Sequence, residues 1–131
     1  MTKIRAMVVD DEAMARERVV GMLRQEQDIE LIGECSDGQQ AVHAINSQHP
    51  DLVFLDVQMP ACDAFGVIEQ VGAEKMPAVV FVTAYDEYAL RAFEVHAIDY
   101  LLKPFGRERF QQTLQHARAH VGLSRQRPPG R

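Results

Sequence analysis

Short apolar runs alternate five times along the chain with segments whose apolar residues recur at helical spacing. Ala15, Val19 and Leu23, for example, share one helix face because they are spaced four residues apart. Strands that alternate with helices favour a parallel sheet with helices packed on both of its faces. We expect strands at residues 4–9, 29–35, 51–56, 78–83 and 96–102, and helices from residue 12, at 37–49, and at about 63–71, 87–94 and 107–121.

Right-handed connections leave few ways to order five such strands in one sheet. The flavodoxin-like order 2-1-3-4-5 is one of the two common solutions for a doubly wound α/β fold, and we predict it here. The 131 residues suffice for one domain with its own core. We place this domain at residues 1–122 and a disordered linker at residues 123–131, which are rich in proline, glycine and arginine.

The charge and hydropathy of the chain limit the classes of partner that it could bind directly. Its net charge of −5 argues against direct binding of nucleic acid, because phosphate contacts need clustered positive charge. No apolar run approaches the ~20 residues of a membrane helix. The first residues also lack the long apolar stretch of a signal peptide. We therefore expect a cytoplasmic protein with no membrane partner.

Polar side chains stand where the predicted strands end. Asp10 and Asp11 follow the first strand, Asp56 ends the third, Thr83 ends the fourth and Lys103 follows the fifth. The carboxyl ends of parallel strands emerge on one edge of the sheet, where ligands bind in folds of this kind. We therefore expect these five side chains to converge in one site.

Three carboxylates in one site repel one another. At about 4 Å and an effective dielectric constant near 20, each pair costs about 4 kcal/mol, so a cation or a shifted pKa is expected. Hard oxygen ligands of this kind suit Mg²⁺. Asp56 stands alone at its strand end and is the best candidate for a nucleophile that accepts a phosphoryl group, with Asp10 and Asp11 holding the metal.

Each of these residues also has an ordinary structural explanation. Aspartate at a strand-to-helix junction is often a helix cap, which would account for Asp10 and Asp11. Lys103, taken alone, would be a surface lysine, and Thr83 alone would carry no information. The inference depends on their joint placement at the ends of the first, third, fourth and fifth strands.

With these motifs the chain resembles a receiver domain of a bacterial response regulator over about residues 3–121. Four segments carry the resemblance: Val8-Val9-Asp10-Asp11-Glu12, Leu55-Asp56-Val57-Gln58-Met59-Pro60, Val82-Thr83-Ala84 and Lys103-Pro104-Phe105. The resemblance implies that Asp56 accepts a phosphoryl group from a phosphohistidine on a sensor histidine kinase. It also implies that Asp11, Asp56 and the backbone carbonyl of Gln58 ligate Mg²⁺, with Asp10 acting through a bound water.

The same resemblance assigns the remaining site residues. Thr83 and Lys103 would contact the phosphoryl oxygens, and the peptide bond between Lys103 and Pro104 would be cis. Thr83 would move toward the phosphate and Tyr100 would turn inward behind it. This switch would act on the surface formed by the fourth helix, the fifth strand and the fifth helix, which is also a candidate homodimer interface.

Longer segments are similar to receivers paired with a LytTR-type DNA-binding domain; they span residues 11–18, 83–94 and 97–105. We expect such a transcriptional output domain to be missing from these 131 residues, so that DNA is contacted only through it. One segment departs from the family pattern: Ala61 stands where the family usually has glycine. Alanine resists a positive φ, so we expect a slightly reshaped loop.

Two other classes of function remain open. The chain could be a receiver-like dimerisation module that works without phosphorylation, although the intact acidic residues argue against this. It could also be a metal-dependent phosphatase with an aspartyl nucleophile, but Gln58 stands where such enzymes carry a second acid. We expect a phosphoacceptor that assists its own phosphorylation and dephosphorylation, and not an enzyme acting on other substrates.

Overall fold

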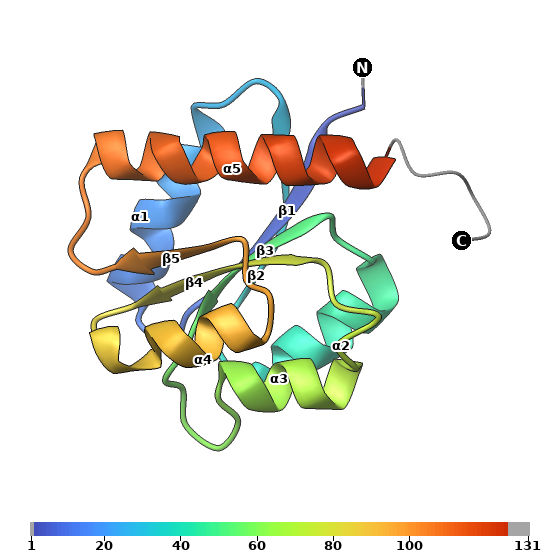
Figure 1. Cartoon of the computed structure of the whole chain (residues 1–131), viewed down its shortest axis with the longest axis vertical. Coiled ribbons are helices and arrows are strands. Elements are labelled where there is room, and N and C mark those ends of the chain that lie inside the picture. The colour runs from blue at the N-terminus through green and yellow to red at the C-terminus, as the bar shows by residue number, and fades with distance from the viewer. Residues whose placement is uncertain (1, 126–131) are drawn as a thin grey trace.

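A computed structural model describes residues 2–125 of the protein. It contains one five-stranded parallel sheet in the order β2-β1-β3-β4-β5, which confirms the predicted flavodoxin-like fold and strand order (Figure 1). The strands are β1 (Ile4–Val9), β2 (Ile29–Cys35), β3 (Leu52–Asp56), β4 (Ala78–Thr83) and β5 (Asp99–Leu102). The helices are α1 (Ala13–Arg24), α2 (Gly38–Gln48), α3 (Ala64–Val71), the short 3₁₀ helix η1 (Asp86–Tyr88), α4 (Ala89–Glu94) and α5 (Arg107–Arg125).

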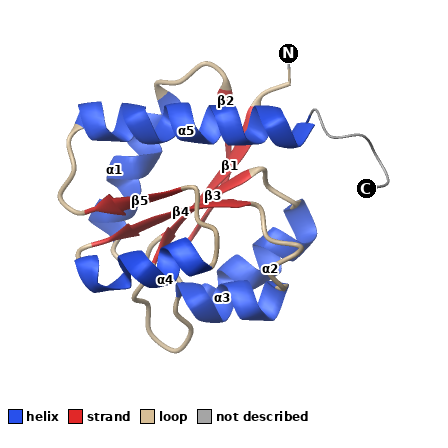
Figure 2. Ribbon diagram, in the orientation of Figure 1, coloured by secondary structure: helices blue, strands red, loops and turns tan. Residues whose placement is uncertain are grey.

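Helices cover both faces of the sheet and divide the core into two layers (Figure 2). On one face α1 and α5 bury Val20, Leu23 and Phe110 against the sheet. On the other face α2, α3 and α4 bury Ile45 and Phe65. Each layer removes a continuous apolar surface from water, and this burial is the main favourable contribution to folding. The sheet is thereby held rigidly enough to position side chains at its carboxyl edge.

The strands differ in polarity according to their place in the sheet. All five residues of the central strand β3 are buried, and its sequence Leu-Val-Phe-Leu-Asp is apolar until the last residue. The edge strand β2 mixes buried and exposed residues, and its Glu30 and Glu34 are exposed. A strand buried on both faces needs a continuous apolar run, whereas an edge strand tolerates polar side chains. The change to aspartate at the end of β3 therefore marks the point where the strand reaches the site.

Three boundaries differ from the sequence-based expectation. β5 begins at Asp99 instead of residue 96, because His96 takes a left-handed conformation (φ 62°) that breaks the extended chain. The helix expected at 87–94 is divided into η1 and α4. The predicted linker was wrong for residues 123–125, since α5 continues to Arg125; residues 126–131 lie outside the described part of the chain.

Polar contacts explain both the position of α5 and its length. Asp99 of β5 accepts hydrogen bonds from Arg109 at 2.8 Å and from Thr113 at 2.8 Å. Burial alone would raise the pKa of Asp99, but these bonds hold it well below its usual range. At the far end Arg125 donates to the carbonyl of Thr2 and to Asp51. These contacts stabilise the last turn of α5, and the sequence pattern did not indicate them.

Within residues 2–125, no helix combines the length and the apolar character that crossing a membrane would require.

Gly38 allows α2 to begin close to the loop between β3 and α3. A Cβ atom at this position would lie 2.4 Å from the carbonyl oxygen of Cys62 and 2.8 Å from its Cβ. The first atom belongs to the backbone, so relief of the clash would need a shift of the whole loop. Asp37, which caps α2 through a 2.8 Å bond from the Gln40 amide, fixes the helix start at this point.

We expect Gly38→Ala to destabilise the fold by about 1–3 kcal/mol, as overpacking against fixed atoms typically does. Gly21→Ala is the matched control, because Gly21 lies in α1 and nothing would contact its added Cβ within 4 Å. This control should stabilise the fold by about 0.5–1 kcal/mol, since alanine favours helix. Urea unfolding of both variants measures the difference. Equal stability of the two variants would contradict the close approach of α2 and the loop.

Candidate functional site

The register of the parallel strands brings four polar residues to one edge of the sheet. Val9 pairs with Leu55, so the next residues along these two strands are Asp10 and Asp56. Asp56 pairs with Val82, which places Thr83 one step further, and Thr83 pairs with Leu102, which places Lys103 one step further again. The structure thus brings these residues together at one edge, as the sequence predicted.

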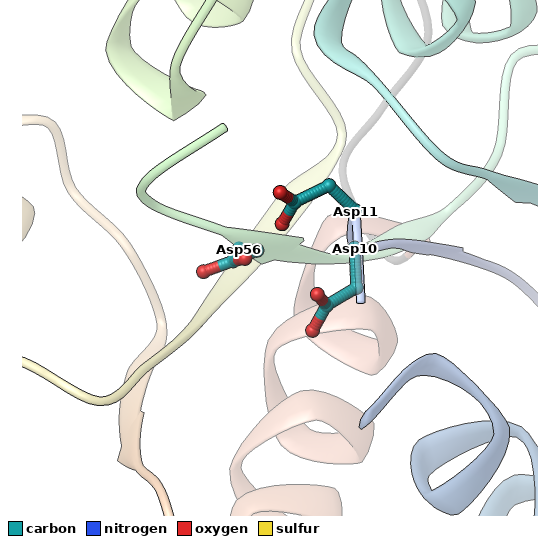
Figure 3. A group of neighbouring side chains, drawn as sticks. All are labelled: Asp10, Asp11 and Asp56. Atoms are coloured by element: carbon teal, nitrogen blue, oxygen red, sulfur yellow. The ribbon is translucent and has the colours of Figure 1, made fainter. Parts of the chain in front are cut away.

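Three carboxylates form the centre of the site. Asp10 and Asp56 are 3% and 5% exposed, whereas Asp11 is exposed to solvent. One oxygen of each carboxylate lies within 4.8 Å of the corresponding oxygens of the other two. Figure 3 shows the three side chains gathered at the ends of β1 and β3. Two largely buried carboxyl groups and one exposed carboxyl group therefore share a space the size of a single cation site.

Lys103 is the positive group of this site. Its Nζ atom lies 2.9 Å from Oδ2 of Asp10 and 4.0 Å from Oδ2 of Asp56. The ammonium also lies 3.3 Å from Oε1 of Glu12. Glu12 was not among the predicted site residues, although the run Asp10-Asp11-Glu12 was a signal that could have revealed it. A single ammonium is therefore shared among several carboxylates.

This imbalance of charge changes the acidity of the central groups. Burial and the neighbouring charge of Asp10 raise the pKa of Asp56 to about 8, despite the opposing effect of Lys103. Burial alone would lower the pKa of Lys103, but its bond to Asp10 and the charge of Asp56 raise it overall. The ammonium is therefore retained at neutral pH, while Asp56 without a cation holds a proton that an ordinary aspartate would release.

The carboxylates fit a divalent cation. Asp10, Asp11 and Asp56 provide the hard oxygen donors that Mg²⁺ prefers. A cation placed among them would relieve the repulsion that raises the pKa of Asp56. The exposure of Asp11 leaves one side of the cluster open for water or an incoming group.

Thr83 and Tyr100, the two residues expected to act as a switch, are connected through the segment between β4 and η1. Thr83 is 1% exposed, and its Oγ1 accepts a hydrogen bond from the Tyr85 amide at 3.3 Å. The hydroxyl of the half-buried Tyr100 donates to the Tyr85 carbonyl. The same short segment therefore contacts both side chains.

Gln58 lies in the loop that follows β3, two residues beyond Asp56. Its side chain is exposed, and its Nε2 donates a hydrogen bond to the hydroxyl of Tyr88 in η1. No sequence pattern indicates this contact, because the two residues are thirty positions apart and neither belongs to a motif that pairs them. Tyr88 is thus a second residue near the site that the sequence analysis missed.

Two loops around the site have special backbone conformations. Ala61 has a φ of 69°, so alanine does not prevent the left-handed turn that glycine would favour here. The peptide bond between Lys103 and Pro104 is cis, which confirms the expectation from the family resemblance. After it, Phe105 is held by a hydrogen bond from Arg18 to its carbonyl oxygen.

Comparison with known proteins agrees with this geometry. Residues 6–115 match the family model described as response regulator receiver domain. An uncharacterized response regulatory protein of Yersinia pestis is 50% identical over 111 residues, which cover 85% of this chain and 47% of the relative. The transcriptional regulatory protein BtsR of Escherichia coli K12 is 44% identical over 115 residues, or 88% of this chain and 48% of BtsR. The chain therefore spans about half the length of the curated relatives it matches.

Solved structures show the same fold. The response regulatory domain of protein mrkE from Klebsiella pneumoniae superposes with a TM-score of 0.83 at 27% identity, covering 91% of this chain and 98% of that domain. The signal receiver domain of the putative response regulator NarL from Mycobacterium tuberculosis has a TM-score of 0.76 at 30% identity, covering 97% of this chain and all of that domain.

Ala61→Gly is expected to stabilise the protein by about 0.5–1 kcal/mol. A left-handed conformation costs an L-residue roughly 1–2 kcal/mol, and the greater freedom of glycine in the unfolded chain offsets part of the gain. Ala73→Gly, in a loop where φ is not positive, is the control and should destabilise. Thermal unfolding of both variants checks the prediction. A loss of stability in Ala61→Gly would show that the left-handed turn carries no strain.

Asp56→Asn is expected to stabilise the metal-free protein more strongly as the pH rises. When the pKa of a carboxyl is higher in the folded protein than in the unfolded chain, its protonation stabilises the fold. This stabilisation is fully present below the unfolded pKa of about 4, and it is lost as the pH rises through the folded pKa of about 8. Asparagine does not titrate, so the advantage of the variant should reach about 2 kcal/mol or more at pH 8.

Urea unfolding in the presence of a chelator, at pH 5 and pH 8, measures this difference. Asp37→Asn controls for the change in net charge, because Asp37 is a half-buried cap of α2 and does not belong to the three-carboxylate cluster. An advantage of Asp56→Asn that is equal at both pH values would contradict the raised pKa.

Proposed function

The chain belongs to the response regulator receiver domain family, and from this premise we propose that it is a phosphoacceptor switch. Asp56 accepts a phosphoryl group from a phosphohistidine of a sensor histidine kinase, the kind of protein with which receiver domains interact. The observation that carries this proposal is the convergence of Asp10, Asp11, Asp56 and Lys103 within one site, with the pKa of Asp56 raised by burial and by Asp10.

The acidic residues have distinct roles in this proposal. Asp11, Asp56 and the backbone carbonyl of Gln58 would hold Mg²⁺ directly, and Asp10 would hold it through a water molecule. When bound, Mg²⁺ supplies positive charge that favours the ionised form of Asp56 and neutralises the oxygens of the transferring phosphoryl group. The donor set supports this assignment because all of these ligand atoms are hard oxygens.

The transfer exchanges one bond to phosphorus for another. A carboxylate oxygen of Asp56 attacks, the bond from phosphorus to the imidazole nitrogen breaks, and the nitrogen keeps the electron pair. Lys103, whose ammonium lies 4.0 Å from Asp56, donates hydrogen bonds to the phosphoryl oxygens as charge builds on them. Thr83 donates from its hydroxyl. Both residues thus stabilise a group that is more negative than the carboxylate it replaces.

Phosphorylation is then transmitted through Thr83 and Tyr100. Movement of the Thr83 hydroxyl toward the phosphoryl group breaks its bond from the Tyr85 amide. The Tyr85 carbonyl, which accepts from the Tyr100 hydroxyl, moves with the same segment and frees Tyr100 to turn inward. The switch is a small rearrangement between two packed states.

The output of the switch would lie in a second domain. Relatives named as transcriptional regulators are about twice as long as the matched region, so their names describe a longer protein. We propose a LytTR-type DNA-binding domain, controlled through the surface of α4, β5 and α5. Leu90 and Phe93 of α4 are 73% and 79% exposed, which supports this surface as a site of homodimerisation.

Phosphorylation of Asp56 can be tested without knowledge of the kinase. Incubation with Mg²⁺ and acetyl phosphate should give a single adduct of about 80 Da in the intact mass, the increment of one phosphoryl group. The adduct should be absent from Asp56→Asn and should form much more slowly in Lys103→Met, which lacks the ammonium.

Three results separate the possible functions. An adduct that depends on Asp56 and Mg²⁺ supports the phosphoacceptor. The absence of any adduct in the wild-type protein would favour a phosphorylation-independent dimerisation module. Rapid turnover of acetyl phosphate over many cycles would favour a phosphatase.

A further inference from the structure

The segment from Tyr85 to Tyr88, which contains η1, is connected to the acidic site by two separate sets of hydrogen bonds. The first set joins Thr83 to the backbone of Tyr85 and the backbone of Tyr85 to Tyr100. The second joins the side chain of Gln58, in the loop after β3, to the hydroxyl of Tyr88 at the other end of η1. Only the first set uses the residues that the proposed function already assigns to the switch.

The hydrogen bond between Gln58 and Tyr88 joins the β3–α3 loop to η1, two segments that are far apart in sequence. Gln58 Nε2 is the donor and Tyr88 Oη is the acceptor, with 2.5 Å between them. Gln58 and Tyr88, together with Met59, Pro60 and Asp63, line an open hollow of about 450 Å³. The β3–α3 loop is therefore joined to η1 by this bond, whose two partners both line the hollow.

The ring of Tyr88 is held in place by its neighbours. It packs against Phe65 of α3, with the ring centres 6.2 Å apart, and against Tyr85 at 6.4 Å. Phe65 is itself buried and covered by the guanidinium group of Arg91, which lies 3.9 Å from its ring centre. A side chain fixed in this way presents its hydroxyl to Gln58 with little freedom to move away.

We propose that Tyr88 is a positioning residue for the metal-binding loop: its hydrogen bond to the Gln58 side chain orders the segment that carries the Gln58 carbonyl. This inference rests on the proposed function, in which that carbonyl ligates Mg²⁺. A loop that is already ordered loses less conformational entropy when it binds the metal. The hydrogen bond between Tyr88 and Gln58 therefore increases the affinity for Mg²⁺. By thermodynamic reciprocity, Mg²⁺ also stabilises the contact of η1 with the loop.

The bond between Gln58 and Tyr88 joins two side chains, whereas the proposed Mg²⁺ ligand is the backbone carbonyl of Gln58, so side-chain substitutions can remove the bond and keep the ligand. Tyr88→Phe removes the hydroxyl and keeps the ring that packs on Phe65. Gln58→Met removes the donor and keeps the length of the side chain and the backbone carbonyl. The double variant shows whether the two changes act through the same bond. Tyr85→Phe is the matched control, since it removes a hydroxyl from the same segment and keeps the Tyr85 backbone.

Mg²⁺ affinity is measured by calorimetry on the full chain, and hydrogen exchange of the backbone amides of residues 57–59 and 61 is measured without metal. Loss of one net hydrogen bond should weaken Mg²⁺ binding by about threefold to tenfold in each single variant. The double variant should be no weaker than the single ones, because both remove the same bond. Exchange in the metal-free loop should become faster in all three, and Tyr85→Phe should bind Mg²⁺ like the wild type.

Unchanged or tighter Mg²⁺ binding in Tyr88→Phe would overturn the inference, as would effects that add in the double variant. If the wild type binds Mg²⁺ and forms the Asp56 adduct while these variants behave like it, only the role of Tyr88 fails. If the wild type neither binds Mg²⁺ nor forms the adduct, the proposed function fails and this inference fails with it.

Discussion

Asp10 and Asp56 bring two carboxylates into the interior of the protein, and Lys103 is the ammonium placed between them. Desolvation penalises each charge, and the two negative groups repel one another, so this part of the molecule is poorly balanced without a cation. Burial and Asp10 together raise the pKa of Asp56 to about 8. The proposed chemistry depends on this imbalance, since it gives the site affinity for a cation and a reason to change when its charge changes.

The fold is what makes this arrangement possible. Asp10 and Lys103 are separated by ninety-three residues, yet they form a hydrogen bond at 2.9 Å because β1 and β5 end on the same edge of one sheet. The apolar layers on both faces hold the strands in register, and that register places Asp56 beside Asp10. Hydrophobic burial therefore supplies the free energy that keeps like charges close together.

Much of the fold and the centre of the site could be predicted from the sequence. The apolar run that ends in Asp56 predicts a buried strand. It also predicts that Asp56 lies at the carboxyl edge of the sheet, where ligands bind, so one pattern located both the strand and the site residue. The contacts of Tyr88 and Arg125 could not be predicted in the same way. Each depends on where a long side chain meets a distant part of the chain, and neither periodicity nor strand order specifies that contact.

The most direct test of the account is the titration of the Asp56 carboxyl carbon by NMR, with the protein first in chelator and then saturated with Mg²⁺. The account predicts a pKa near 8 without metal and a large fall when Mg²⁺ is present, because the cation removes the repulsion from Asp10. An ordinary aspartate pKa of about 4 in the metal-free protein, or a raised value that Mg²⁺ leaves unchanged, would contradict it.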